Sequence, residues 1–207
     1  MKETGIIMSG NHPRLVMNGL KTMTRRTYGL ERINQNPDAW VSLGSFVDGY
    51  GDRWRFRRHG IDEEVIIKCP YGGIGDRLWV RETFDYIFGD EGDYLIYKAD
   101  KESAEWFKQR KAEGSEITWK PSIHMFRKDS RAVLENTAIR AERVQEITEE
   151  DAQAEGIQPL PEQWDACYTD AFIRLWDSLN AKRGYGWDFN PWVWPISFKL
   201  ITDYKVQ

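Results

Sequence analysis

Residues 19–26 read GLKTMTRR and place a glycine, a lysine, two threonines and two arginines in one short stretch. Gly19 follows a short apolar segment and is expected to end a helix there. The residues after it are expected to be extended, with Thr24 and Arg26 on one face of a strand. The stretch is therefore either a solvated basic turn or a reactive lysine and threonine beside an anion-binding patch, and Lys21 is the residue on which the difference depends.

The chemistry of this stretch depends on the state of its lysine. A threonine hydroxyl such as that of Thr24 is a weak nucleophile until a base removes its proton. Lys21 can be that base only if burial or neighbouring cations lower its pKa, and Arg25 and Arg26 supply such cations. Short runs of these residue types also occur on solvated turns, so the pattern alone leaves both interpretations open.

The composition limits the classes of protein that need to be considered. A chain of 207 residues with 41% hydrophobic residues suits one globular domain, and we expect 1–207 to be a single domain with an insertion at about 27–63. The net charge of −4 excludes a general polyanion binder, so any contact with nucleic acid must be local. The 10 tryptophans suit either a large core or a surface that stacks on bases, with the core favoured for most of them.

Metal, redox and membrane functions find little support. Cys69 and Cys167 form no CxxC pair, which argues against a zinc knuckle or a disulfide framework and favours a cytoplasmic setting. His12 and His59 have no partners at ligand spacing, so no metal site and no cofactor are expected. No apolar run reaches the length of about 18 residues that spans a bilayer, so no membrane contact is expected.

Expected strands outnumber expected helices, and the helices are short connectors. This pattern predicts an α+β protein, a mixed β-barrel with short peripheral helices and an inserted hairpin. Strands are expected at 4–8, 64–70, 77–88, 93–99, 119–125, 131–147 and 191–201, and helices at about 99–114, 148–156 and 163–180. The strand at 131–147 is either long or broken near 135–137, and Thr148 followed by Asp151 predicts a capped start for the helix at 148–156. The last helix has an apolar stripe of Phe172, Leu175, Trp176 and Leu179, and Pro195 suggests that the final strand is an edge strand or has a bulge.

The expected hairpin lies in the stretch FVDGYGDRWRF, residues 46–56, with its turn at Asp48–Gly51. Its second arm alternates arginines with Trp54 and Phe56, so one face is cationic and the other aromatic. Two interpretations remain open: a solvated edge strand protected by charge, or an arm that faces RNA.

The pattern G-x-K-x-x-T-x-R, filled by Gly19, Lys21, Thr24 and Arg26, resembles the signature of the ASCH domain, a β-barrel family related to the PUA domains that bind RNA. The threonine version is similar to small bacterial ASCH proteins that act as N4-acetylcytidine amidohydrolases with a lysine, this threonine and a downstream glutamate. The resemblance implies that Lys21 and Thr24 are catalytic. The segment ITEEDAQAEGI, residues 147–157, resembles the glutamate region and places Glu155 at the third catalytic position.

Three further stretches resemble longer ASCH-like proteins of phages and prophages: YGGIGDRLWVRETF (71–84), WKPSIHMFRKDSR (119–131) and LWDSLNAKRGYGWDFNPWVWPISF (175–198). Trp79 and Arg81 are expected to share one face of a strand. Arg81 and Glu82 form either a structural ion pair or part of the site. His124 either contacts a base or is a structural histidine. With Arg25 and Arg26 these four are the candidate residues for binding substrate or RNA.

These observations predict an amidohydrolase that removes an acyl group from the exocyclic amine of a cytidine-type nucleoside. In this prediction Arg26 or the backbone amides near Gly19 stabilise the oxyanion. The partner is a nucleoside or RNA. The main alternative is a non-catalytic RNA-binding module in which Lys21, Arg25 and Arg26 hold phosphate. A ribonuclease and a phage accessory protein without enzymatic activity also remain open, and the pattern says nothing about oligomeric state.

Overall fold

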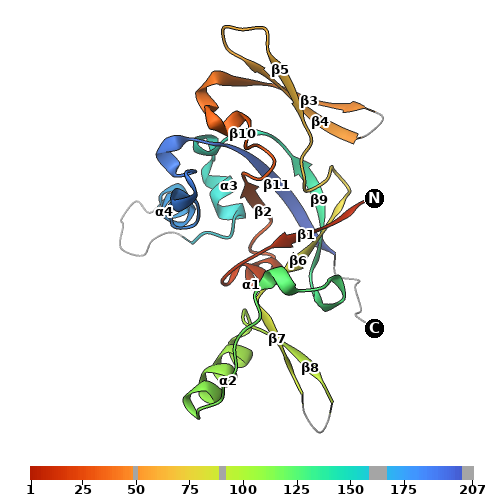
Figure 1. The fold of residues 1–207 in the computed structure, drawn as a ribbon, viewed down its shortest axis with the longest axis vertical. Coiled ribbons are helices and arrows are strands. Elements are labelled where there is room, and N and C mark those ends of the chain that lie inside the picture. The colour runs from red at the N-terminus through yellow and green to blue at the C-terminus, as the bar shows by residue number, and fades with distance from the viewer. Residues whose placement is uncertain (49–50, 89–91, 159–166, 202–207) are drawn as a thin grey trace.

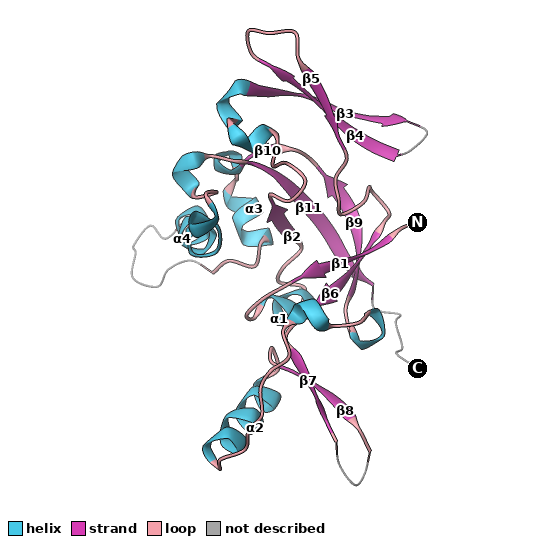
Figure 2. Cartoon of the chain, in the orientation of Figure 1, coloured by secondary structure: helices cyan, strands magenta, loops and turns pink. Residues whose placement is uncertain are grey.

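The computed structural model describes residues 1–48, 51–88, 92–158 and 167–201 (Figure 1). Its main sheet has six strands, and most neighbouring pairs are antiparallel, whereas β1 and β6 are parallel. The sheet curls into an open half-barrel with helices on its outside (Figure 2), and the expected α+β class is confirmed. Its strands are β1 (Glu3–Ile7), β6 (Arg77–Arg81), β9 (Val133–Ile139), β11 (Trp192–Ile201) and β10 (Glu142–Arg143) in spatial order, with β2 (Met23–Arg26) on β11.

β11 is the strand of the main sheet that pairs with the most neighbours. It pairs with β2, β9 and β10, so the prediction that Pro195 marks an edge strand is wrong. A proline is tolerated here because β10 pairs only as far as Val193 and β9 pairs only from Ile196 onward. The predicted irregularity is present, but it lies between Ser197 and Phe198, where the register of β9 shifts.

A second sheet carries the predicted hairpin. β3 (Trp40–Asp48) pairs with β4 (Gly51–Arg58), and β4 also pairs with β5 (Glu64–Ile67). The hairpin is confirmed, but β4 is the central strand of three, so the edge-strand interpretation is wrong. The alternation of faces is as predicted, because Trp54 and Phe56 are buried.

The aromatic face of β4 joins the two sheets. The ring of Trp54 lies 4.8 Å from that of Trp194, and the ring of Phe56 lies 5.2 Å from that of Trp192, both in edge-on geometry. Such pairs add to the burial of large apolar surfaces. Two short 3₁₀ turns, η1 (Ile33–Gln35) and η2 (Pro37–Ala39), lead into β3. The inserted segment therefore contributes to the main hydrophobic core.

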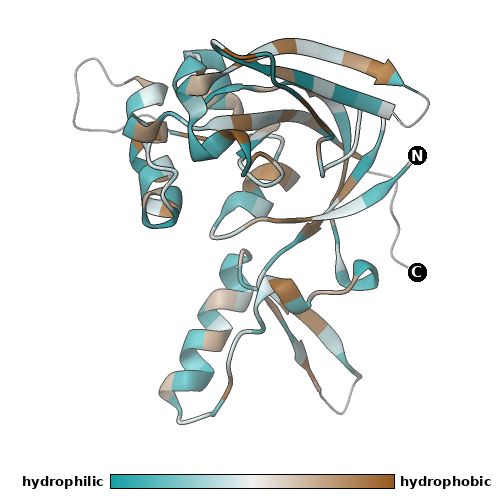
Figure 3. Cartoon of the chain, turned by 45° about the horizontal axis from the view of Figure 1, so that its top comes forward, coloured by the Kyte–Doolittle hydropathy of each residue, from teal (hydrophilic) through white to brown (hydrophobic). Residues whose placement is uncertain are grey.

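The expected long strand at 77–88 is two strands in different sheets. β6 ends at Arg81, and β7 (Phe84–Ile87) pairs with β8 (Tyr94–Tyr97) in a separate hairpin. The chain leaves the main sheet after Arg81, and the buried carboxylate of the next residue, Glu82, pairs with Arg131. The helix α2 (Lys101–Ala112) lies beside this hairpin and is hydrophilic along most of its length (Figure 3).

The expected strand at 119–125 is also wrong. Lys120 forms only an isolated bridge to Phe84, and the chain continues as the 3₁₀ turns η3 (Ser122–His124) and η4 (Arg127–Asp129). Pro121 explains the difference because it has no N–H to donate to a neighbouring strand.

The C-terminal half supplies two helices on one side of the sheet. The stretch 131–147 is interrupted at residues 140–141 and forms β9, β10 and the turn η5 (Val144–Glu146). The predicted irregularity near 135–137 is the register shift that leaves Thr137 without a partner on β11. α3 (Glu149–Ala154) begins with the predicted cap, since Thr148 accepts a hydrogen bond from the Asp151 N–H. α4 (Tyr168–Asn180) corresponds to the helix expected at 163–180, of which residues 163–166 lie outside the described part. Among the described residues, no helix is long and apolar enough to cross a membrane.

Candidate active site

The position of Lys21 is set by the end of α1 (His12–Met17). Gly19 has a φ of 70° and ends this helix as predicted. The N–H groups of Leu20 and Lys21 then both donate to the Leu15 carbonyl, which turns the chain sharply into β2. This turn, rather than a regular strand, places Lys21 on the same side as Thr24.

A second segment, from the end of α3, meets this turn. The Thr22 N–H donates to the Ala154 carbonyl at 2.8 Å. Gly156 follows with a φ of 79°, and a Cβ on it would lie 3.1 Å from the Cβ of Lys21, so a side chain there would press against the lysine. The sequence thus brings residues more than 130 positions apart into direct contact.

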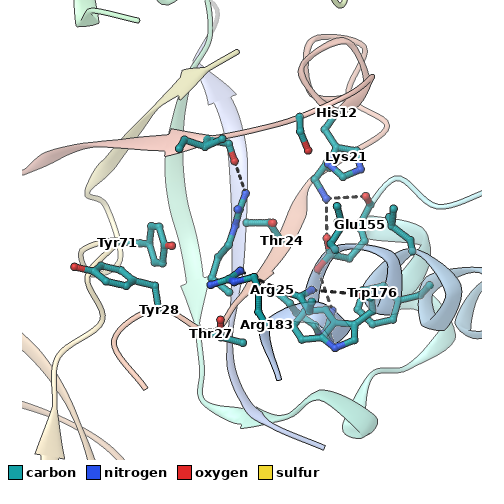
Figure 4. A pocket seen from close by; sticks show the side chains of 17 residues that line it. His12, Lys21, Thr24, Arg25, Thr27, Tyr28, Tyr71, Glu155, Trp176 and Arg183 are labelled. Atoms are coloured by element: carbon teal, nitrogen blue, oxygen red, sulfur yellow. Dashed lines mark hydrogen bonds and ion pairs between the residues drawn. The ribbon is translucent and has the colours of Figure 1, made fainter. Parts of the chain in front are cut away.

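Lys21 and Glu155 form a buried ion pair in this contact (Figure 4). The Nζ of Lys21 donates to Oε2 of Glu155 at 2.6 Å and to the Glu155 carbonyl at 2.7 Å. The two residues are 2% and 6% exposed. A carboxylate at the C-terminal end of a helix is unfavourable by itself, and the lysine offsets this cost.

Both residues line a cavity of about 260 Å³ between the curled sheet, α1 and α4. This volume is near the lower end of the range of small-molecule sites, which begins at about 300 Å³. Thr24 is buried and lines the same cavity as Lys21 and Glu155 (Figure 4). The other polar and aromatic side chains of the lining are Ser9, His12, Arg25, Arg26, Thr27, Tyr28, Tyr71, Phe172, Trp176, Asn180 and Arg183.

Burial has the largest influence on the pKa of Lys21 and lowers it. The charge and the hydrogen bond of Glu155 oppose this shift, whereas the positive charges of Arg26 and Arg25 add to it. The pKa of Lys21 therefore lies below its ordinary value of 10.5. A lysine in this environment gives up its proton more readily than one in water.

Arg25 has its guanidinium behind the ion pair, where carboxylates surround it. Its Nη2 donates to Glu142 at 2.8 Å and to Asp151 at 2.5 Å, and its Nη1 lies 3.5 Å from Oε1 of Glu155. Three buried atoms of this region nevertheless lack a hydrogen bond: Oε1 of Glu155, Nε of Arg25 and Nε of Arg26. Unsatisfied buried polar atoms are costly, and they mark groups that are available to a ligand.

Arg26 is the cation of the stretch that has no carboxylate partner among the described residues. Its Nη2 donates to the Ile7 carbonyl at 2.7 Å. The backbone amides near Gly19, the predicted alternative for oxyanion stabilisation, are all occupied: Gly19 donates to Val16, and the next two amides donate to Leu15. Of the two predicted oxyanion donors, Arg26 is the one left with a free N–H, at its Nε.

Four of the predicted binding residues lie outside this cavity. The Arg81 guanidinium lies over the Trp79 ring at 5.3 Å, so these two do share a face, and it donates to the carbonyls of Ser122 and Ile123. The ion pair between Arg81 and Glu82 is wrong, because Glu82 accepts both of its hydrogen bonds from Arg131.

His124 is exposed at the end of η3, and Glu82 lies at a second cavity of about 510 Å³. These residues became candidates because their motifs resemble longer ASCH-like proteins, and such a resemblance does not indicate which residues lie close together in space.

Several lining residues were not predicted as part of the site. They come from separate segments, and nothing in their local sequence indicates a shared cavity: His12, Tyr28, Tyr71 and Arg183. The apolar stripe of α4 did give a signal, since all four of its residues line the cavity. Phe172 and Trp176 of this stripe are buried in a hydrophobic cluster, as the amphipathic pattern predicts, and the stripe also forms one wall of the cavity.

Burial, together with the positive charges of Lys21 and Arg26, lowers the pKa of His12 to about 4. His12 is therefore neutral at pH 7. In the described segments, no group of three or more His, Cys, Asp or Glu side chains is placed to hold a metal ion.

Comparison with known proteins gives one distant structural likeness. No family model matches the chain, and no curated protein does. The fold is similar to that of an ASCH domain from Lactobacillus crispatus JV V101, known from a high-resolution crystal structure, with a TM-score of 0.40 and 10% identity over 96% of this chain and 79% of the other. This is the family that the stretch at 19–26 resembles. A likeness this distant transfers neither an activity nor a set of site residues.

Proposed function

We propose that this protein is an amidohydrolase that removes an acyl group from the exocyclic amine of a cytidine-type base, with Thr24 as nucleophile, Lys21 as base and Glu155 as its partner. The observation that carries the proposal is the buried 2.6 Å contact between Lys21 and Glu155 in a cavity that Thr24 also lines. An amine, a hydroxyl and a carboxylate within one small cavity are the groups that acyl transfer requires.

The first half of the reaction forms an acyl ester on Thr24. Lys21 passes a proton to Glu155 along their short contact, and the free amine accepts the proton of the Thr24 hydroxyl as its oxygen attacks the amide carbonyl. The carbon–nitrogen bond then breaks, and Lys21 returns the proton to the leaving amine. The lowered pKa of Lys21 favours this role, because a base is most effective when its pKa is close to the working pH.

The second half releases the acid. Water attacks the ester carbonyl, Lys21 accepts its proton, and the Thr24 oxygen leaves with a proton from the same amine. Both halves pass through an oxyanion. The Arg26 Nε, buried and without a partner, is the donor that stabilises it.

Aromatic side chains at the other end of the cavity bind the base. Tyr28 and Tyr71 lie across from Lys21 and Glu155 (Figure 4), and a flat ring between them and the catalytic wall places its exocyclic amide at Thr24. Stacking of a base on an aromatic side chain contributes about 1–3 kcal/mol.

The test is turnover of N4-acetylcytidine by the purified protein. Thr24→Val preserves the shape of the side chain and removes only the hydroxyl, so it is expected to abolish turnover and leave the fold intact. Thr22→Val is the matched control, because Thr22 is exposed, belongs to the same segment and does not line the cavity. During turnover by the native protein, mass spectrometry is expected to find an acyl group on Thr24. Turnover that survives Thr24→Val rules out the assigned nucleophile.

RNA binding without catalysis is the second candidate, and one observation favours it. Arg55 and Arg57 of β4 point away from the core and are exposed, as an RNA-facing arm requires. Arg25 does not support this function, since its guanidinium is held by Glu142 and Asp151. Binding through the arm predicts affinity for RNA that falls with salt and is insensitive to Thr24→Val.

A further inference from the structure

Arg183 is a cation at the cavity for which the proposed reaction has no use. It lies in the 3₁₀ turn η6 (Ala181–Arg183) directly after α4, is exposed, and contributes to the cavity lining. Its Nη1 makes one long contact of 3.4 Å to Asn180, and its guanidinium lies 5.8 Å from the Tyr185 ring. It has no carboxylate partner within the described ranges.

The charge of the lining is unbalanced around Arg183. The basic side chains of the lining are Lys21, Arg25, Arg26 and Arg183, and its one carboxylate among the described residues is Glu155, which is bound to Lys21. Arg25 is neutralised by carboxylates outside the cavity. Two guanidinium groups therefore face the cavity without a counter-charge, although the whole chain has a net charge of −4.

Tyr71 lines the cavity together with these two arginines. Burial raises the pKa of its hydroxyl, and the positive charges of Arg26 and Arg183 both oppose that shift, which places both guanidinium groups within electrostatic reach of one hydroxyl. Because the Arg26 Nε is assigned to the oxyanion, Arg26 contributes to a ligand at this end of the cavity through its positive charge. A guanidinium and a hydroxyl that line one cavity beside a second positive charge are suited to a phosphate, because both groups can donate to its oxygens and the charge attracts it.

We propose that Arg183, assisted by the charge of Arg26 and by the Tyr71 hydroxyl, forms a subsite for a phosphate group of the substrate. The substrate is then a nucleotide, free or as a unit of an RNA strand, rather than a neutral nucleoside. The identity of the base rests on the proposed function, whereas the phosphate subsite rests on the cavity alone.

Binding is measured first, because it does not depend on turnover. Calorimetric titration at low salt compares cytidine with cytidine 5′-monophosphate. We expect the phosphate to tighten binding by about tenfold or more, as charge-assisted hydrogen bonds do. Arg183→Ala is expected to remove most of this difference. Lys182→Ala is the matched control, because this neighbouring cation is exposed and does not line the cavity, and it is expected to retain the difference.

Equal affinity for the two ligands overturns the subsite, as does an equal loss in Lys182→Ala, which would indicate general surface charge. A third ligand, a short oligoribonucleotide with a central cytidine, separates the two sources of phosphate. Tighter binding of the mononucleotide indicates a free nucleotide, and tighter binding of the oligonucleotide indicates RNA. Either result depends on Arg183 if the subsite is correct.

Turnover separates this proposal from the proposed function. Native protein and Arg183→Ala are assayed with N4-acetylcytidine and with its 5′-monophosphate, and the variant is expected to raise KM for the phosphorylated substrate alone and leave kcat unchanged. If the phosphate tightens binding but neither compound is hydrolysed, the hydrolase fails and the subsite stands. If both compounds are hydrolysed alike by both proteins, the subsite fails and the hydrolase stands.

Discussion

Two buried ion clusters in this protein are built from similar residues and differ in how completely they are satisfied. The Glu82 cluster consists of Glu82, Arg131 and Asp100, and the Lys21 cluster consists of Lys21, Glu155 and Arg25. In the Glu82 cluster, Arg131 donates to both oxygens of Glu82 at 2.9 and 3.0 Å and to Asp100 at 2.7 Å. Its guanidinium also lies 3.9 Å from the centre of the Tyr97 ring.

The pKa shifts of the two cations, Arg131 and Lys21, agree with this difference in hydrogen bonding. Burial lowers the pKa of Arg131, but the hydrogen bonds and charges of Glu82 and Asp100 outweigh it, and the pKa rises. In the Lys21 cluster burial outweighs the carboxylate, and the pKa of Lys21 falls. The first cluster holds its proton more firmly than a free arginine, and the second holds its proton less firmly than a free lysine.

This difference separates a structural ion cluster from a reactive one. In the Glu82 cluster, each nitrogen of the Arg131 guanidinium donates to a carboxylate and both oxygens of Glu82 accept, so this cluster stabilises the chain where it leaves the main sheet. The Lys21 cluster borders a cavity and leaves Oε1 of Glu155 and Nε of Arg25 without hydrogen bonds. Both clusters border a cavity, since Glu82 and Asp100 line the second one, but of the two only the Lys21 cluster leaves buried side-chain atoms without a hydrogen bond, which makes it the candidate for function.

The largest effect is expected for Lys21→Met. Loss of the base is expected to lower kcat/KM for N4-acetylcytidine by at least about 10³-fold. The change also leaves Glu155 as a buried, unpaired carboxylate, which destabilises the fold by about 3–5 kcal/mol.

The double variant Lys21→Met with Glu155→Gln separates the two effects. It removes the unpaired charge and is expected to recover most of the unfolding free energy, measured by urea denaturation, with no recovery of activity. Activity that returns together with stability would assign Lys21 a purely structural role.

Arg131→Ala tests the other cluster and has its main effect on stability. It leaves Glu82 buried without a partner, so the free energy of unfolding is expected to fall by about 3–5 kcal/mol. Because Arg131 does not line the cavity of Lys21, kcat per folded molecule is expected to change by less than about threefold. A loss of kcat in protein shown to be folded by circular dichroism would place the Glu82 cluster in the reaction.

The sequence predicted the elements that depend on local chemistry. The helix end at Gly19, the Thr148 cap of α3 and the two faces of β4 all follow from the preferences of a few neighbouring residues, and each is present. The prediction of one long strand at 77–88 is wrong, because the place where this segment divides is not visible in its local sequence. Its pattern of alternating residues continues through Glu82. The partner of Glu82 at the division is Arg131, which is 49 positions away in the sequence.

The candidate site likewise combines features that follow from local sequence with features that depend on residues far apart in the sequence. Lys21 and Thr24 come from one stretch, and their shared wall follows from the turn after Gly19. Their placement beside Glu155 could be anticipated only through a family resemblance, because the two segments are far apart in sequence. Arg183 and Tyr71 reach the cavity through the fold alone, so no local pattern indicates them.

His12 makes the region around the Lys21 cluster sensitive to acid. Its pKa is about 4 in the folded protein, against 6.5 for an ordinary histidine, so the unfolded chain binds more protons between these values. Stability from this group is present above pH 6.5 and is lost as the pH falls toward 4, by about 3 kcal/mol at most.

The variant His12→Gln is expected to flatten the fall in unfolding free energy between pH 6.5 and 4, as measured by denaturation at a series of pH values. His59→Gln, at an exposed histidine, is the control and is expected to keep the native slope. An unchanged slope in His12→Gln would show that His12 is protonated as easily in the folded protein as in the unfolded chain.

The smallest effect is expected where an ion pair is exposed. Arg55 lies 3.8 Å from Glu64, and both side chains are more than 40% exposed. Exposed pairs contribute little because water solvates each charge almost as well as the partner does, so Arg55→Ala is expected to change the free energy of unfolding by less than about 0.5 kcal/mol. Since stability is barely affected, any fall in RNA affinity of this variant is a direct measure of RNA binding by the outer face of β4. Unchanged affinity would remove that face from consideration and leave the cavity as the place where this protein meets its substrate.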